Sequence, residues 1–257
     1  MKPYMHISTD DMITVLEDLA RYASSYTSMF DQPIMSFLRD MHLQYGLVHS
    51  GYVFYESVDQ SFDLTQVPET FASEFQVNAH WLRWGFHANN VRSRYESATY
   101  DQAKNDYARV LRELTPITGG TTAIDRVVRT HFYEGSKEAV SAFKNHSTLG
   151  VSGLLTSEDD RLSYDLSAEK CDELKRYGRM RDVERGLTFL RTDLRLEHVQ
   201  GVEGQLREFA VAERDLIIFT HEKYLSTEEM KEKIRLCCEF AVGNGYRFGF
   251  PMNEIDY

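Results

Sequence analysis

The sequence predicts an α/β barrel in which about seven short strands alternate with amphipathic helices. Short apolar runs are followed repeatedly by segments with helical spacing, and this alternation favours parallel strands joined by crossover helices. The length of 257 residues is typical of an α/β barrel. Because no internal repeat or Pro/Gly/Ser-rich linker interrupts the chain, we expect one domain over residues 1–257.

The first third of the chain contains two expected strands and three expected helices. An apolar and aromatic run predicts a strand over 3–8, and the segment MITVLEDLARY predicts a helix over 12–23. Apolar residues three or four apart predict a helix over 31–45. After a glycine turn, a second strand is expected over 46–56, and residues 70–78 have the pattern of a short helix.

The middle of the chain repeats this order. The segment WLRWGFHANN predicts a third strand over 81–90 that enters a loop. A helix is expected over 99–114, with TPITGG as its stop signal. A fourth strand over 125–135 precedes a helix over 136–147, and the apolar run GVSGLLT begins a fifth strand over 150–160.

The last third continues the pattern. Apolar runs predict a sixth strand over 187–198 and a seventh over 215–222, and residues 227–245 have the spacing of a helix. A doubly wound open sheet is the alternative arrangement for such a series. The sequence has no G-x-G-x-x-G or G-x-x-x-x-G-K-[ST] after a strand, so the usual dinucleotide and P-loop functions lack support.

The charge balance limits the classes of partner. Asp plus Glu number 40 and Lys plus Arg number 29, which gives a formal charge of −11. This excess argues against nucleic acid, because phosphate binding needs a concentrated basic surface, and against an anionic membrane surface. No apolar stretch is long enough to cross a bilayer. We therefore expect no nucleic-acid partner and no membrane partner.

Cysteine usage and the first residues bear on location. The three cysteines are odd in number and two are adjacent, which favours reduced thiols over a disulfide framework. The segment MKPYMHISTDD contains no apolar signal core. We expect a cytoplasmic protein. Many barrels are dimers, so a homodimer is an alternative to a monomer.

Polar residues of the metal-binding and acid–base types gather at the carboxyl ends of the expected strands, where barrels place their active sites. They are Asp10, Asp11, His87, Asn89, Asn90, Arg129, His131, Asp159, Asp160, Asp193, His221 and Glu222. In the fourth strand, alternation puts Arg129 and His131 on one face. Asp is also a common helix N-cap residue, so Asp10 and Asp11 fit that role equally well. Asp159 and Asp160 also fit as loop or capping residues, and Glu222 as the start of a helix.

Three segments that contain such residues are HISTDD, WGFHANN and IIFTHE. They resemble motifs of the polysaccharide deacetylases, the NodB-type carbohydrate esterases, and they occur in the same order over residues 4–222. The resemblance implies a distorted (β/α)7-type barrel that hydrolyses N- or O-acetyl groups with a divalent metal, often zinc. It implies that Asp11 and His87 are metal ligands, that Asp10 is the catalytic base and His221 the general acid, and that Arg129 orients Asp10.

The sequence departs from the family pattern at two places. Val91 stands four residues after His87, where the family has its second histidine ligand. We expect His131 to replace it, because strand geometry places His131 beside Arg129 at the same end of the barrel. The segment RTHFYEG stands in place of the family's arginine-proline-aromatic motif.

The expected function is removal of an acetyl group from an acetylated sugar or a related small substrate, with zinc as the expected metal. An Asp-His-His set leaves a catalytic zinc one open position for water. One alternative is a non-catalytic carbohydrate-binding or regulatory relative of the same fold. Another is a different metal-dependent hydrolase or isomerase that acts on a small sugar or a nucleotide sugar.

Overall fold

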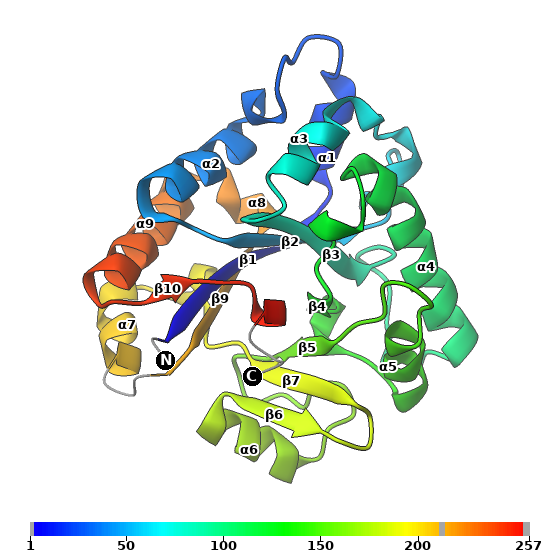
Figure 1. Cartoon of the computed structure of the whole chain (residues 1–257). Helices are drawn as coiled ribbons and strands as arrows, with labels where there is room; N and C mark the ends of the chain where they lie inside the picture. The colour runs from blue at the N-terminus through cyan, green and yellow to red at the C-terminus, as the bar shows by residue number, and fades with distance from the viewer. Residues whose placement is uncertain (1–2, 211–213, 254–257) are drawn as a thin grey trace.

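The computed structural model describes residues 3–210 and 214–253, whose strands form two sheets at the centre of the molecule (Figure 1). The first sheet has the order β3-β2-β1-β9-β8, and β10 pairs with the start of β1. Its strands are β1 (Tyr4–Met12), β2 (His49–Phe54), β3 (Leu82–Ala88), β8 (Leu194–Arg195), β9 (Leu216–His221) and β10 (Arg247–Phe248). The second sheet has the order β4-β5-β7-β6. Its strands are β4 (Val127–Val128), β5 (Gly153–Thr156), β6 (Arg179–Asp182) and β7 (Leu187–Arg191).

The two sheets meet at both sides. A parallel bridge between Trp84 and Ile124 links β3 to the segment before β4. On the other side, β7 continues into β8 after only Thr192 and Asp193, so one run of chain serves both sheets. Taking β7 and β8 as one kinked strand gives seven parallel positions in the order β3-β2-β1-β9-β8/β7-β5-β4. Outside this series, β6 pairs antiparallel with β7, and β10 pairs parallel with the start of β1. This is the distorted (β/α)7-type barrel that the resemblance implies.

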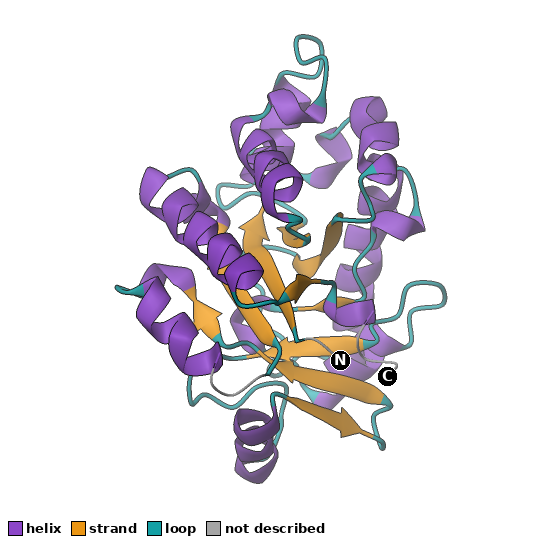
Figure 2. Ribbon diagram, turned by 60° about the vertical axis from the view of Figure 1, so that its left-hand side comes forward, coloured by secondary structure: helices purple, strands orange, loops and turns teal. Residues whose placement is uncertain are grey.

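Helices surround the strands (Figure 2). They are α1 (Thr14–Arg21), α2 (Pro33–Tyr45), α3 (Ala72–Val77), α4 (Tyr100–Ile117), α5 (Lys137–Lys144), α6 (Ala168–Tyr177), α7 (Val202–Ala210), α8 (Glu222–Leu225) and α9 (Glu228–Gly243). The start and end of α2 show why the sequence forms a helix there. The Gln32 side chain accepts the N–H groups of Ile34 and Met35, and Gly46 ends the helix at a φ of +79°.

The core lies between the strands and the helices. Phe86 of β3, Tyr107 of α4 and Phe143 of α5 are buried and in aromatic contact, with ring centroids 5.0–5.5 Å apart. Because each ring comes from a different element, this cluster fixes two helices against the strand that carries His87.

Every helix of the described chain is too short or too polar to span a bilayer.

Several expected elements have different bounds. The predicted fourth strand over 125–135 is wrong for most of its length, since β4 has two residues and residues 131–133 form a 3-10 turn. The chain leaves the extended conformation because Phe132 and Tyr133 have φ values of +58° and +60°. The predicted sixth strand is divided into β7, β8 and a turn over 196–198. Helix α4 continues past the expected stop, through Pro116 to Ile117.

Candidate active site

A β-bulge in β1 lies at two adjacent carboxylates, Asp10 and Asp11. Strand β1 pairs with β2 up to Thr9 opposite Gly51 and again at Met12 opposite Val53, so β1 has one extra residue. Asp11 lies in this bulge with a φ of +62°. A bulge changes the direction in which a side chain points, and Asp tolerates the left-handed region better than most residues. Asp10 is buried, whereas the Asp11 side chain is 26% exposed.

Asp10 forms a buried ion pair with Arg129. Arg129 Nη1 lies 2.7 Å from Asp10 Oδ1, and the two side chains are 1% and 2% exposed. The guanidinium also donates to Ser8 Oγ and Thr192 Oγ1, each at 3.1 Å, and lies 4.1 Å from the centre of the Phe219 ring. Burial is the largest single effect and lowers the pKa of Arg129, but the Asp10 charge, together with smaller contributions from Tyr133 and Tyr52, raises that pKa overall. Asp10 is therefore held in one orientation by a permanent cation.

His87 has one ring nitrogen engaged and one directed at Asp11. Its Nδ1 lies 2.5 Å from the carbonyl oxygen of Arg129, which can only accept, so Nδ1 carries the proton. Nε2 lies 3.1 Å from Asp11 Oδ1, and neither atom has a hydrogen-bond partner in the described chain. Burial raises the pKa of Asp11, but the contact with His87 and the charges of the neighbouring histidines outweigh burial and lower that pKa to about 2.

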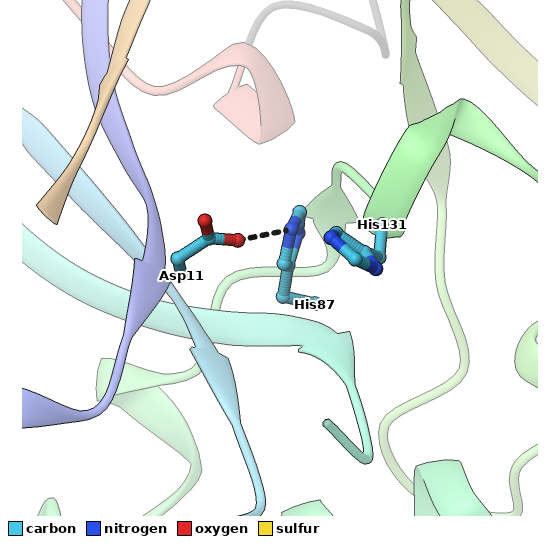
Figure 3. A group of neighbouring side chains, drawn as sticks. All are labelled: Asp11, His87 and His131. Carbon is cyan, nitrogen blue, oxygen red and sulfur yellow. Dashed lines mark ion pairs between the residues drawn. The ribbon is translucent and has the colours of Figure 1, made fainter. Parts of the chain in front are cut away.

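His131 completes a group of three metal-type side chains (Figure 3). One ligand atom from each of Asp11, His87 and His131 lies within 4.8 Å of the others. The Nδ1 atom of His131 is buried without a hydrogen-bond partner in the described chain. Burial, followed by the His87 charge, lowers the pKa of His131 to about 3, which keeps this ring neutral near pH 7.

These residues fit a divalent cation. Three buried atoms, two imidazole nitrogens and one carboxylate oxygen, have no hydrogen-bond partner among the described residues, and an unsatisfied buried polar atom is costly. A neutral imidazole and an ionised carboxylate are the forms that bind metal. The Nδ1 contact of His87 to a backbone carbonyl is the kind of outer contact that orients a metal-binding histidine. Zinc accepts this set of donors.

His221 lies next to Asp10 on the neighbouring strand β9. The two residues are directly opposite each other in the β1–β9 pair. His221 Nδ1 contacts Glu197 Oε1, and the same carboxylate oxygen accepts from Arg195 Nε at 2.9 Å. Glu197 is 5% exposed. Glu197 was not predicted as a site residue, because it lies in the turn over 196–198 and no sequence motif marks it.

All six predicted site residues line one cavity of about 390 Å³. The predicted residues are Asp10, Asp11, His87, Arg129, His131 and His221. Val91, Thr130, Phe132, Tyr133 and Phe219 complete much of the wall. The backbone strain at Asp11, Phe132 and Tyr133 is thus concentrated around this cavity, as is common at functional sites.

Other polar residues expected at strand ends are engaged elsewhere. Asp159 pairs with Arg161, and Asp160 pairs with Lys175, as their alternative loop role predicts. Asp193 pairs with Arg214 at 2.7 Å, and burial raises the pKa of Asp193 to about 6. None of these carboxylates lines the cavity.

Glu222 has a structural role in the bend after the bulge. Its buried carboxylate accepts the backbone N–H groups of Ile13, Thr14 and Val15 at 3.2, 2.8 and 2.7 Å. These donors belong to the first turn of α1, which carries no side-chain cap of its own. Glu222 therefore fixes the chain immediately after Asp11 and Met12.

The Glu197–His221 contact predicts a pH-dependent stability. Burial raises the pKa of Glu197, but the hydrogen bond and charge of His221 outweigh it and lower that pKa to about 2. A carboxylate whose pKa is lower in the folded protein stabilises it above the unfolded value, near 4.5, and that stability is lost as the pH falls towards 2. Urea unfolding at pH 6, 4 and 3 measures the free energy of unfolding. As the pH falls, this free energy should decrease more steeply for wild type than for Glu197→Gln. Parallel curves would contradict this assignment.

Comparisons with known proteins bear on the fold. No family model matches the sequence, and no curated protein matches it. Among solved structures, a family 4 acetyl xylan esterase from Clostridium thermocellum, in complex with a cobalt ion, matches with a TM-score of 0.53 and 12% identity. That match covers 96% of this chain and 87% of the esterase.

A second solved structure comes from Mycobacterium smegmatis and is named as a polysaccharide deacetylase. It matches with a TM-score of 0.52 and 13% identity, over 92% of this chain and 84% of that one. At such identities the likeness concerns the fold. The comparisons confirm that this chain has the fold of the NodB-type polysaccharide deacetylases.

Proposed function

We propose that the protein is a metal-dependent hydrolase that removes an N- or O-linked acetyl group from a carbohydrate or a sugar derivative. The observation that carries the proposal is the convergence in one cavity of a candidate metal group and two acid–base residues. Asp11, His87 and His131 form the metal group, with Asp10 and His221 beside it. The deacetylase fold supports the same assignment.

Asp11, His87 and His131 would hold the cation, and zinc suits their donor atoms. When bound, a divalent cation supplies a Lewis acid that lowers the pKa of water and polarises a carbonyl group. The protein's own contribution is the arrangement of the three ligands. Successive side chains of a regular strand point to opposite faces, so the bulge allows both Asp10 and Asp11 to line one cavity.

Asp10 would be the general base. Arg129 holds its carboxylate in place, leaving the second oxygen to accept a proton from the attacking water. His221 would protonate the leaving nitrogen or oxygen through Nε2, because its Nδ1 is engaged by Glu197. An amide nitrogen leaves poorly without such an acid. The burial of Asp10 and Arg129 limits competing hydrogen bonds from water.

The non-catalytic alternative is less well supported. A protein that only bound sugar would not require a buried Asp10–Arg129 pair opposite an oriented histidine in the same cavity. A different metal-dependent hydrolase or isomerase would use the same metal group, so the released product distinguishes it from a deacetylase.

The test is release of acetate by protein of defined metal content. Protein stripped with a chelator is reconstituted with one equivalent of zinc or cobalt, and acetate is measured with acetylated monosaccharides, chito-oligomers and acetylated xylan. We expect the metal-free protein to be inactive and either cation to restore acetate release. No acetate from any of these substrates at full metal occupancy would contradict the proposal.

A further inference from the structure

The charges that line the cavity differ in balance from those of the whole chain. The chain has a formal charge of −11. The cavity, in contrast, is lined by four cationic side chains and two carboxylates. The cations are Arg129, Arg161, Arg195 and Lys223, and the carboxylates are Asp10 and Asp11. The lining therefore contains more cations than carboxylates, whereas the chain as a whole contains more carboxylates than cations.

Each of the three arginines is neutralised by a carboxylate. Arg129 pairs with Asp10 at 2.7 Å. Arg161 pairs at 2.6 Å with Asp159, a residue that is not part of the cavity lining. Arg195 pairs with Glu197 at 2.9 Å, and Glu197 also engages His221. These three cations hold the protein's own acidic groups and offer little net charge to a ligand.

Lys223 differs from these arginines. It is exposed, and no carboxylate in the described chain forms an ion pair with it. Its Nζ atom lies 4.8 Å from the centre of the Tyr224 ring. The adjacent carboxylate, Glu222, points inward to the start of α1, as described above, and so does not neutralise Lys223.

We propose that the substrate carries an anionic group, a phosphate or a carboxylate, in addition to its acetyl group, and that Lys223 binds this anion. The proposal rests on the proposed function of the cavity. Lys223 follows His221 by two residues and lines the same cavity, so an anion seated on it would place the rest of the substrate beside the candidate acid and metal group. A lysine binds such a group as a point charge.

The energetic reason for a cationic residue here lies in the surrounding charge. The acidic surface of the chain repels an anionic substrate, and an unpaired cation in the cavity lining attracts it locally. Because Lys223 is exposed, its attraction is screened by salt. Recognition of an anion through Lys223 should therefore weaken as ionic strength rises, and a neutral substrate should show no such trend.

The experiment compares N-acetylglucosamine, its 6-phosphate and N-acetylmuramic acid as substrates of the zinc-reconstituted protein. For at least one anionic substrate we expect a kcat/KM about tenfold or more above that of the neutral sugar, mainly through KM, and a decrease of this preference in 0.5 M NaCl. Comparison of the 6-phosphate with N-acetylmuramic acid, which carries a carboxylate, identifies which anion is preferred. Lys223→Met should reduce the preference to threefold or less, and Lys223→Arg should retain most of it.

The matched control is Lys104→Met, because Lys104 is an exposed lysine of α4 that lies outside the cavity lining. This variant should keep the wild-type preference. Equal kcat/KM for neutral and anionic sugars in wild type would overturn the proposal, and so would a preference that Lys223→Met leaves intact.

A binding measurement separates this proposal from the proposed function. Titration calorimetry on metal-free protein, which cannot turn over by the proposed mechanism, compares N-acetylglucosamine 6-phosphate with N-acetylglucosamine. Tighter binding of the phosphate that is lost in Lys223→Met supports the anion site even if no acetate is ever released. Equal affinities, or a difference that the variant retains, refute the site even if the neutral sugar is deacetylated.

Discussion

Asp10→Asn is expected to lower kcat for acetate release by about 10²–10⁴-fold, which is the usual contribution of a general base. Asn has nearly the same shape and keeps an oxygen for Arg129 Nη1, but it cannot accept the proton. Metal content should stay at the wild-type level, because Asp10 is not one of the three clustered ligands. The measurements are acetate release and metal content by plasma mass spectrometry on the same preparations.

The stability of this variant needs a separate measurement, because Arg129 is buried. Removing the charge of one partner of a buried ion pair leaves an uncompensated charge, and losses of about 3–5 kcal/mol are typical when a partner is removed outright. Urea unfolding therefore accompanies the assay, and Asp40→Asn on the exposed face of α2 is the matched control. Full activity in Asp10→Asn would eliminate Asp10 as the base, and loss of metal would reassign it as a ligand.

The sequence predicted the composition of the site better than the course of the backbone. Asp10, His87 and His221 lie at strand ends, and parallel strands bring such ends together whatever the exact bounds of each strand. His131 was predicted from alternation along a strand that the structure ends at Val128. It reaches the cavity instead through the 3-10 turn over 131–133.

The features that the sequence did not predict depend on contacts between distant segments. The bulge at Asp11 is set by the register of β1 against β2, and no local pattern encodes it. Glu197 meets His221 only because β8 turns sharply beside β9. Glu222 lies more than 200 positions from the helix turn that it caps. Such pairings follow from topology, which strand and helix periodicity do not determine.

His131→Ala should weaken zinc binding if the metal site is rearranged, that is, if His131 supplies the ligand that the resemblance places four residues after His87. Changes in outer contacts of a metal site typically cost 10–100-fold in affinity, so loss of a direct ligand should cost at least about 100-fold. His87→Ala should have a similar effect. His80→Ala is the matched control, since His80 is exposed and lies outside the cavity lining. Zinc affinity is measured by competition with a chromophoric chelator.

Val91 allows this prediction to be tested in the opposite direction. It lines the same cavity and stands four residues after His87, where the resemblance to the deacetylases implies a histidine. If His131 has taken over that role, adding Val91→His to His131→Ala should recover part of the lost zinc affinity, because a nitrogen donor returns to the cavity from the other side. Wild-type zinc affinity in His131→Ala alone would refute the rearranged site. Recovery in the double variant would mean that the fold accepts its third ligand from either of two segments, which explains how a chain can keep this cavity without the family's usual histidine pair.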